Sequence, residues 1–244
     1  MIARLLAAKA EIVLGALLVI RHRTPRLTAL LVLAVVASGF LTRGGSGSPA
    51  HSPWVVFVVA GSLVAVSASR LLAPGAALAA GYRVAASWWL VPSARLVGAL
   101  FVTFPLVAGA ALVLGQPVGA GFSAGELIFV TGLYAATLAA LVLALTPAVG
   151  ASAAAAIGFM AAWFGMLPPS AVSNAFERWP IVQRALVLAW NSLPLGWRAT
   201  RWLERGTHGD GFLLFGWLLV GLATAAWAIT WALRSRNQKP GGAV

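Results

Sequence analysis

The sequence predicts an all-α membrane protein that crosses the bilayer six times, and three observations lead to this prediction. Of the 244 residues, 61% are hydrophobic and 9% are charged, whereas soluble domains have roughly 45–50% apolar and about 25% charged residues. The mean hydropathy is +0.92. The apolar residues form long runs, and the Lys and Arg residues lie between the runs. A water-soluble chain of this length could not bury so much apolar surface.

An α-helix needs about 20 residues to cross roughly 30 Å of hydrocarbon. Six apolar runs in the sequence are near that length. Thr146–Pro147 separates the fourth run from the fifth, so we expect a tight helical hairpin at that break. Small residues such as Gly150 and Gly158 favour close packing of this hairpin inside the chain over an interface between two copies. The six predicted spans are residues 27–41, 54–72, 94–114, 127–145, 149–167 and 212–233.

The N-terminal residues are predicted to form an amphipathic helix in the headgroup plane. Residues 2–20 mix Arg4, Lys9 and Glu11 with leucines at helical spacing, as interfacial helices do. We do not expect a cleaved signal peptide, because the apolar stretch contains Lys9 and Glu11 and no clean small-residue cleavage site follows it.

A second amphipathic segment is predicted at residues 76–92, between the second and third spans. Its aromatic side chains have an apolar ring and one polar tip, which suits the membrane–water boundary or a cleft on a soluble partner. We favour docking to a partner over simple anchoring at the headgroups. The residues that carry this interpretation are Tyr82, Arg83, Trp88, Trp89 and Pro92.

The basic residues predict the orientation of the chain. There are 17 Lys and Arg against 5 Asp and Glu, a net charge of +12. The bases lie between apolar runs instead of along one solvated face, so membrane orientation explains them better than nucleic acid does. A cytoplasmic N-terminus puts most of them inside, which predicts an inner-membrane protein with both termini cytoplasmic. The bases on that side would be Arg4, Lys9, Arg21, Arg23, Arg26, Arg70, Arg83, Arg95, Arg234, Arg236 and Lys239.

The residues that carry chemistry are sparse. No ionisable residue lies in the middle of a predicted span, which argues against an intramembrane proton relay. There is no cysteine, and the three histidines and five acids form no metal-ligating pattern. Residues 121–125 fit the G-x-S-x-G pattern around Ser123, but a nucleophile elbow needs a strand-to-helix turn, a His and an acid. We expect a flexible turn and a helix start there, and neither a catalytic site nor a cofactor.

Residues 168–211, before the sixth span, are neither apolar enough to span nor polar enough for a simple loop. Prolines divide the segment, which predicts two short helices, residues 173–190 and 194–205. If they dip into the outer leaflet, their irregular backbone must be buried in protein or line a wet cavity, which makes the segment a candidate outer gate. The alternative is a pair of surface helices held by tryptophans. The candidate gate residues are Trp179, Trp190, Pro194 and Trp197.

This order of elements resembles the ABC type-2 exporter permeases, and two stretches carry the likeness. The first, Gly81 to Arg95 (GYRVAASWWLVPSAR), is similar to the coupling helix of that family. The second, Asn191 to Arg201 (NSLPLGWRATR), precedes a short polar loop, the last span and a basic tail from Arg234 to Arg236. One departure is that residues 71–95 contain no acid, whereas the family's coupling region typically carries one.

The resemblance implies a single transmembrane domain over residues 1–244. It comprises an interfacial helix (1–26), five spans (27–167), a re-entrant segment (168–211), the last span (212–233) and a cytoplasmic tail (234–244). It also implies two copies of a separate ATPase, docked at the coupling helix, and a second permease copy or paralogue. ATP hydrolysis would reside on the ATPase, so the chain itself would not be an enzyme.

Three alternatives stay open at this stage. One is a haem-export-type permease of cytochrome c maturation, which shares the six-span plan. A second is a non-catalytic accessory subunit that scaffolds a larger membrane complex, which would explain the lack of polar residues inside the spans. The third, an intramembrane enzyme, has Ser123 as its only motif.

Overall fold

A computed structural model describes residues 2–43, 53–72, 90–114 and 122–237, and within these ranges every regular element is an α-helix. This confirms the all-helical prediction. The ten helices are α1 (Ile2–Arg21), α2 (Arg23–Arg43), α3 (Pro53–Ala68), α4 (Leu90–Leu114), α5 (Ala124–Val149), α6 (Ala151–Phe164), α7 (Pro169–Ala175), α8 (Pro180–Ser192), α9 (Gly196–Arg205) and α10 (His208–Asn237).

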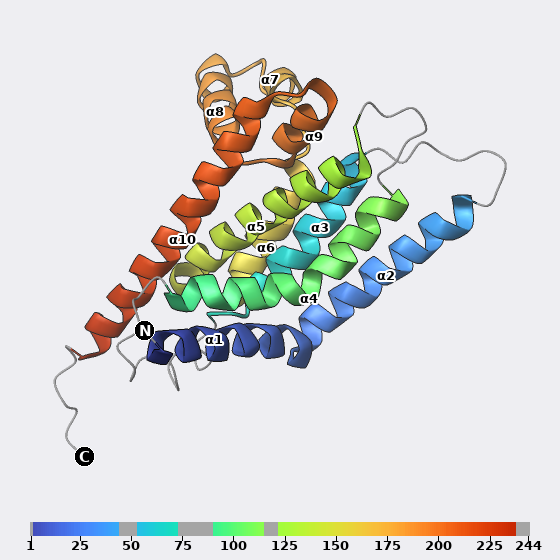
Figure 1. The fold of residues 1–244 in the computed structure, drawn as a ribbon. Helices are drawn as coiled ribbons and strands as arrows, with labels where there is room; N and C mark the ends of the chain where they lie inside the picture. The colour runs from blue at the N-terminus through green and yellow to red at the C-terminus, as the bar shows by residue number, and fades with distance from the viewer. Residues whose placement is uncertain (1, 44–52, 73–89, 115–121, 238–244) are drawn as a thin grey trace.

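The long helices α2 to α6 and α10 run up and down alternately through one bundle (Figure 1). The short helices α7, α8 and α9 lie together at one end of the bundle, which we call the upper end. Helix α1 lies across the opposite, lower end, beside the first half of α4. Helix α5 is central, because it packs against α3, α4, α6 and α10.

Among the described residues, three helices are each long and apolar enough to cross a membrane: α4, α5 and the Gly209–Ala228 part of α10. Helices α6 and α7 make a fourth candidate if they are counted as one broken span. Helix α3 is apolar but too short to count as a candidate span on its own. The structure therefore supports a membrane protein with three to four candidate spans, and the six predicted spans are confirmed only in part.

Small residues let α3, α5 and α6 approach closely. A Cβ added at Gly158 of α6 would lie 2.4 Å from Cγ2 of Val142 and 2.8 Å from Cβ of Ala65. A Cβ at Gly61 of α3 would lie 2.9 Å from Cβ of Ala162. The predicted packing inside the chain is therefore confirmed at Gly158, whereas a Cβ at Gly150 would have no neighbour within 4 Å.

The hairpin between α5 and α6 turns later than the sequence predicted. Helix α5 continues through Thr146 and Pro147 and ends at Val149, and the turn falls at Gly150. Gly150 has φ = 85°, a backbone conformation that residues with a Cβ rarely adopt. The glycine, and not the proline, therefore sets the end of α5.

Helix α1 packs on α4 along a stripe that repeats every four residues: Glu11, Gly15 and Val19 are buried. A Cβ added at Gly15 would lie 2.3 Å from the Arg95 carbonyl oxygen, and one at Gly98 would lie 1.9 Å from the Ile12 carbonyl oxygen. These distances show that the two backbones touch. The predicted amphipathic helix therefore exists, and one face of it is held by the protein.

Candidate functional site

The upper end of the bundle is built on a sharp break after α6. Helices α6 and α7 meet at 97° across this break. The indole nitrogen of Trp190, near the end of α8, donates to the carbonyl oxygen of Leu167 at 2.8 Å. The backbone nitrogen of Trp197, in α9, donates to the carbonyl oxygen of Gly165 at 2.9 Å. The break is therefore held by the two helices that follow it.

The segment predicted as two helices contains three. Helix α7 begins at Pro169 and ends at Ala175, α8 begins at Pro180, and α9 begins two residues after Pro194. A proline fits the first turn of a helix, where its missing N–H is not needed. Because Pro180 starts a new helix, the expected helix over residues 173–190 is divided in two.

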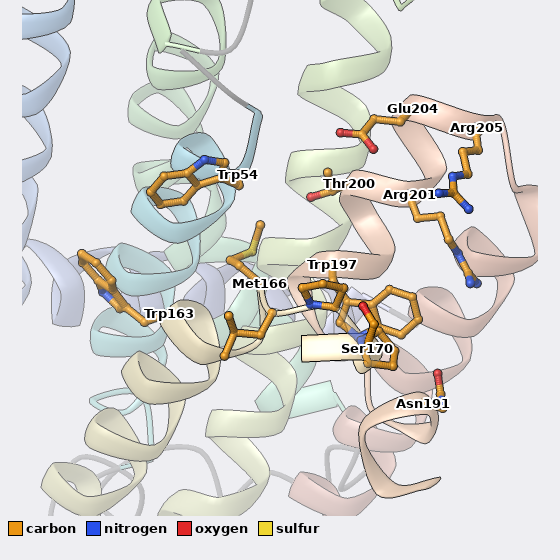
Figure 2. A pocket seen from close by; sticks show the side chains of 13 residues that line it. Trp54, Trp163, Met166, Ser170, Asn191, Trp197, Thr200, Arg201, Glu204 and Arg205 are labelled. Carbon is orange, nitrogen blue, oxygen red and sulfur yellow. The ribbon is translucent and has the colours of Figure 1, made fainter. Parts of the chain in front are cut away.

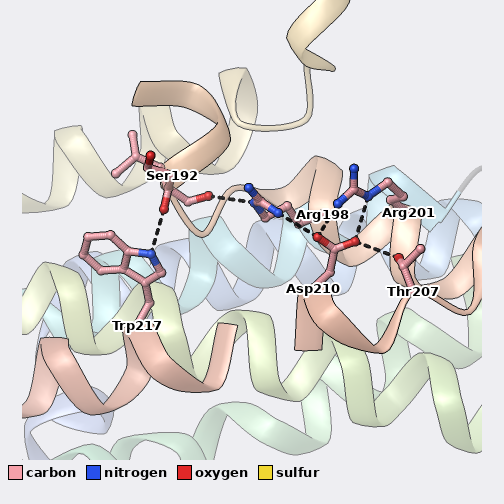
Figure 3. A network of polar contacts seen from close by, with 7 residues as sticks. Ser192, Arg198, Arg201, Thr207, Asp210 and Trp217 are labelled. Atoms are coloured by element: carbon pink, nitrogen blue, oxygen red, sulfur yellow. Dashed lines mark hydrogen bonds and ion pairs between the residues drawn. The ribbon is translucent and has the colours of Figure 1, made fainter. Parts of the chain in front are cut away.

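One buried carboxylate joins α9 to α10. Asp210 accepts from Arg198 Nη1 at 2.7 Å and from Arg201 Nε and Nη2 at 2.7 and 2.6 Å. The Thr207 hydroxyl also donates to it, at 2.7 Å (Figure 3). The Asp210 side chain is 1% exposed, and that of Arg198 is 9% exposed. With two guanidinium groups on one carboxylate, the cluster keeps an excess positive charge.

The same two arginines each contact the ring of Trp197. The guanidinium carbons of Arg198 and Arg201 lie 4.7 and 4.8 Å from the centre of the Trp197 ring system. Such cation–π contacts attract the guanidinium groups to the face of the ring and so help to hold them in position. The hydrogen bonds to Asp210 raise the pKa of Arg201 above its ordinary value. A guanidinium is protonated at physiological pH even without such a shift.

A cavity of about 780 Å³ opens beside α9. Figure 2 shows Trp54, Trp163 and Met166 on one side of it and the α9 side chains on the other. One wall is aromatic and apolar, whereas the other carries hydroxyl, carboxylate and guanidinium groups. The polar wall includes Ser170, Asn191, Thr200, Arg201, Glu204 and Arg205.

The structure brings some of the candidate gate residues together. Trp190 and Trp197 both bond to the break after α6, and Pro194 is buried just before α9. Trp179 lies at the other end of α8, about 16 Å from Trp190 at 1.5 Å rise per helical residue. It is 60% exposed and packs against Phe176. Trp179 therefore does not belong to the cavity.

Four of the five candidate coupling residues, Tyr82, Arg83, Trp88 and Trp89, lie outside the described residues. The fifth, Pro92, is buried in the first turn of α4. The structure therefore describes the start of the third predicted span, and it leaves the coupling helix itself as a prediction.

The lower end contains a buried ion pair that the sequence did not predict. Arg95 Nε donates to Glu11 Oε2 at 2.5 Å, and Arg95 Nη1 donates to the Leu71 carbonyl oxygen at 2.9 Å. Arg95 is 0% exposed and Glu11 is 6% exposed. The sequence had suggested a cytoplasmic base at 95 and a headgroup acid at 11. The one available signal was a single acid among the apolar residues of the first helix.

Ser123 is a helix cap. Its hydroxyl accepts from the Glu126 backbone N–H at 3.1 Å, and the Glu126 carboxylate accepts from the Ser123 N–H at 2.7 Å. This reciprocal capping box starts α5. Within the described residues, no group of three His, Cys, Asp or Glu side chains could hold a metal ion.

Changing Ser123 to alanine is expected to cost about 1 kcal/mol of stability through the lost cap. Thermal unfolding in detergent checks this expectation. A variant as stable as the unaltered protein would show that the capping box contributes nothing to the start of α5.

Comparisons with protein-family models, with curated proteins and with solved structures find no match to this chain.

Proposed function

We propose that the chain is the membrane-spanning subunit of an exporter driven by a separate ABC-type ATPase. In this proposal α2 to α6 and α10 are six membrane crossings. The observation that carries it is the order of the helices: a helix across the lower end, two bundle helices, three more, a group of short helices at the upper end and a last long helix (Figure 1). This is the order that the resemblance in the sequence implies.

The distribution of buried charge supports an external energy source. The buried charged residues of the described chain are Glu11, Arg95, Arg198 and Asp210. The first two meet at the lower end and the last two at the upper end. Within the described residues, the middle of the bundle therefore offers no acidic, basic or histidine side chain for a proton or Na⁺ relay, so the work of transport is assigned to a partner.

The lower end supports the site proposed for that partner. The Arg95 hydrogen bond to Leu71 ties the residues that follow α3 to the start of α4, and the ion pair ties both to α1. The connection 73–89, which contains four of the five proposed coupling residues, leaves and re-enters the described chain at this anchored point. A movement of that connection, driven by the ATPase, would be transmitted to α1, α3 and α4 together.

Purification from the native host in a mild detergent, followed by mass spectrometry, tests the proposal. We expect a stoichiometric partner with the phosphate-binding pattern G-x-x-x-x-G-K-[ST]. The double change Trp88→Ala and Trp89→Ala should remove that partner. Trp179→Ala, an exposed tryptophan at the upper end, should retain it.

Partners without a nucleotide-binding pattern would contradict the proposal and favour an accessory subunit of a larger complex. Equal retention of the ATPase by the double variant and the Trp179→Ala control would contradict the docking site alone.

A further inference from the structure

The cavity beside α9 adjoins an apolar tract between α2, α3 and α6. Trp54 and Trp163 line the cavity and also line a second one of about 300 Å³. That second cavity is formed by α2, α3 and α6 and includes Leu31, Val59 and Phe159. Because the two cavities share side chains, a single extended ligand could lie in both.

The tract has the length of one lipid chain. Its α3 wall extends from Trp54 to Val66, which is about 18 Å along the helix at 1.5 Å per residue. One leaflet of the hydrocarbon core is about 15 Å thick, half of the roughly 30 Å total. The tract therefore matches an acyl chain that runs from the headgroup level toward the bilayer centre.

The tract is also open to the side. Phe159, Met160 and Trp163 of α6 line a shallower groove beside it and are 41%, 52% and 50% exposed. In a membrane these side chains would face lipid. A lipid could therefore enter from within the bilayer without passing through water.

The polar wall selects an anionic headgroup. Arg198, Arg201 and Arg205 outnumber the two nearby acids, Glu204 and Asp210, which leaves one net positive charge. Arg201 uses Nε and Nη2 to hold Asp210, yet its side chain is 38% exposed. Arg205 lies one turn further along α9 and is exposed. Hydroxyl and amide groups of Ser170, Asn191 and Thr200 complete the wall.

We propose that this site binds an anionic glycerophospholipid of the leaflet at the upper end. The phosphate lies against Arg201 and Arg205, and one acyl chain lies between α2, α3 and α6. The lipid lies against the break after α6. It fills a space between the helices that is polar at the headgroup end and apolar at the chain end. The inference requires that the chain lies in a membrane, and it does not depend on an ATPase partner.

Native mass spectrometry of the purified chain, titrated with phosphatidylglycerol or phosphatidylcholine, tests this proposal. We expect phosphatidylglycerol to bind at least several-fold more tightly. Arg205→Gln should weaken its binding about fivefold, since one basic residue at a membrane surface contributes about 1 kcal/mol to anionic lipid binding. Arg184→Gln removes an exposed arginine from α8 and should change nothing.

Two further measurements test the half of the site that would hold the acyl chain. Val59→Phe fills the tract and should weaken phosphatidylglycerol binding, while phosphatidylglycerols of decreasing chain length should bind the unaltered protein progressively less well. The chain-length series keeps the test decisive if Val59→Phe does not fold.

Three outcomes would overturn the proposal. One is equal binding of the two lipids, and another is an Arg184→Gln effect as large as that of Arg205→Gln. The third is binding of glycerol phosphate as tight as that of the lipid, which would make the cavity a site for soluble anions. None of these outcomes bears on whether an ATPase co-purifies.

Discussion

Replacing Arg95 with alanine is expected to lower the free energy of unfolding by about 3–5 kcal/mol, because the Glu11 carboxylate would stay buried without its partner. Arg95 is fully buried and joins three separate parts of the chain: α1, the residues after α3, and α4. Its loss should therefore loosen the whole lower end. Thermal or denaturant unfolding in detergent measures the change.

Two further variants separate the ion pair from ordinary surface charge. Lys9→Ala removes an exposed charge two residues from Glu11 and should change stability by less than about 0.5 kcal/mol. The double change Glu11→Leu and Arg95→Leu should recover most of the loss, because buried pairs can often be replaced by apolar side chains at little cost. An Arg95→Ala variant as stable as Lys9→Ala would show that Glu11 and Arg95 do not form a buried pair.

The helical, membrane-type architecture could be predicted because it depends on local composition. Each predicted span overlaps a helix of the structure, since a run of apolar residues fixes the class of element wherever it packs. The ends of the helices were less predictable. Helix α4 begins at Leu90, four residues before the expected Ala94. Hydropathy places Arg95 at the edge of a span as an unpaired base, whereas the structure pairs it with Glu11, 84 residues away in the sequence.

At the upper end, too, features that depend on neighbouring residues could be predicted, and features that depend on distant contacts could not. Prolines predicted the break before residue 194, because a proline restricts the residue before it and favours a helix start, but the helix expected over residues 173–190 ran through Pro180, where α8 begins. Neither the cavity nor the Asp210 cluster has a local pattern. The cavity needs Trp54 of α3 beside Trp163 of α6 and α9, and only the packed bundle brings these side chains together.

Replacing Asp210 with alanine is expected to have the second large effect, a loss of about 3–5 kcal/mol concentrated at the upper end. Four hydrogen bonds to the carboxylate would disappear, and Arg198 would remain buried without an anion. Because the carboxylate is the main polar link between α9 and α10, α9 should detach before the bundle unfolds. Limited trypsin digestion in detergent should then cut after Arg201 and Arg205 many times faster than in the unaltered protein.

Two matched variants decide whether the carboxylate itself is responsible. Asp210→Asn keeps one acceptor oxygen but no charge, so its cleavage rate should fall between those of Asp210→Ala and the unaltered chain. Glu204→Ala removes an exposed acid from α9 and should leave the digestion pattern unchanged. Equal cleavage of all four proteins would mean that apolar packing holds α9 without Asp210. Faster cleavage confined to the Asp210 variants would identify the buried carboxylate as what keeps α9, and with it the polar wall of the cavity, in place.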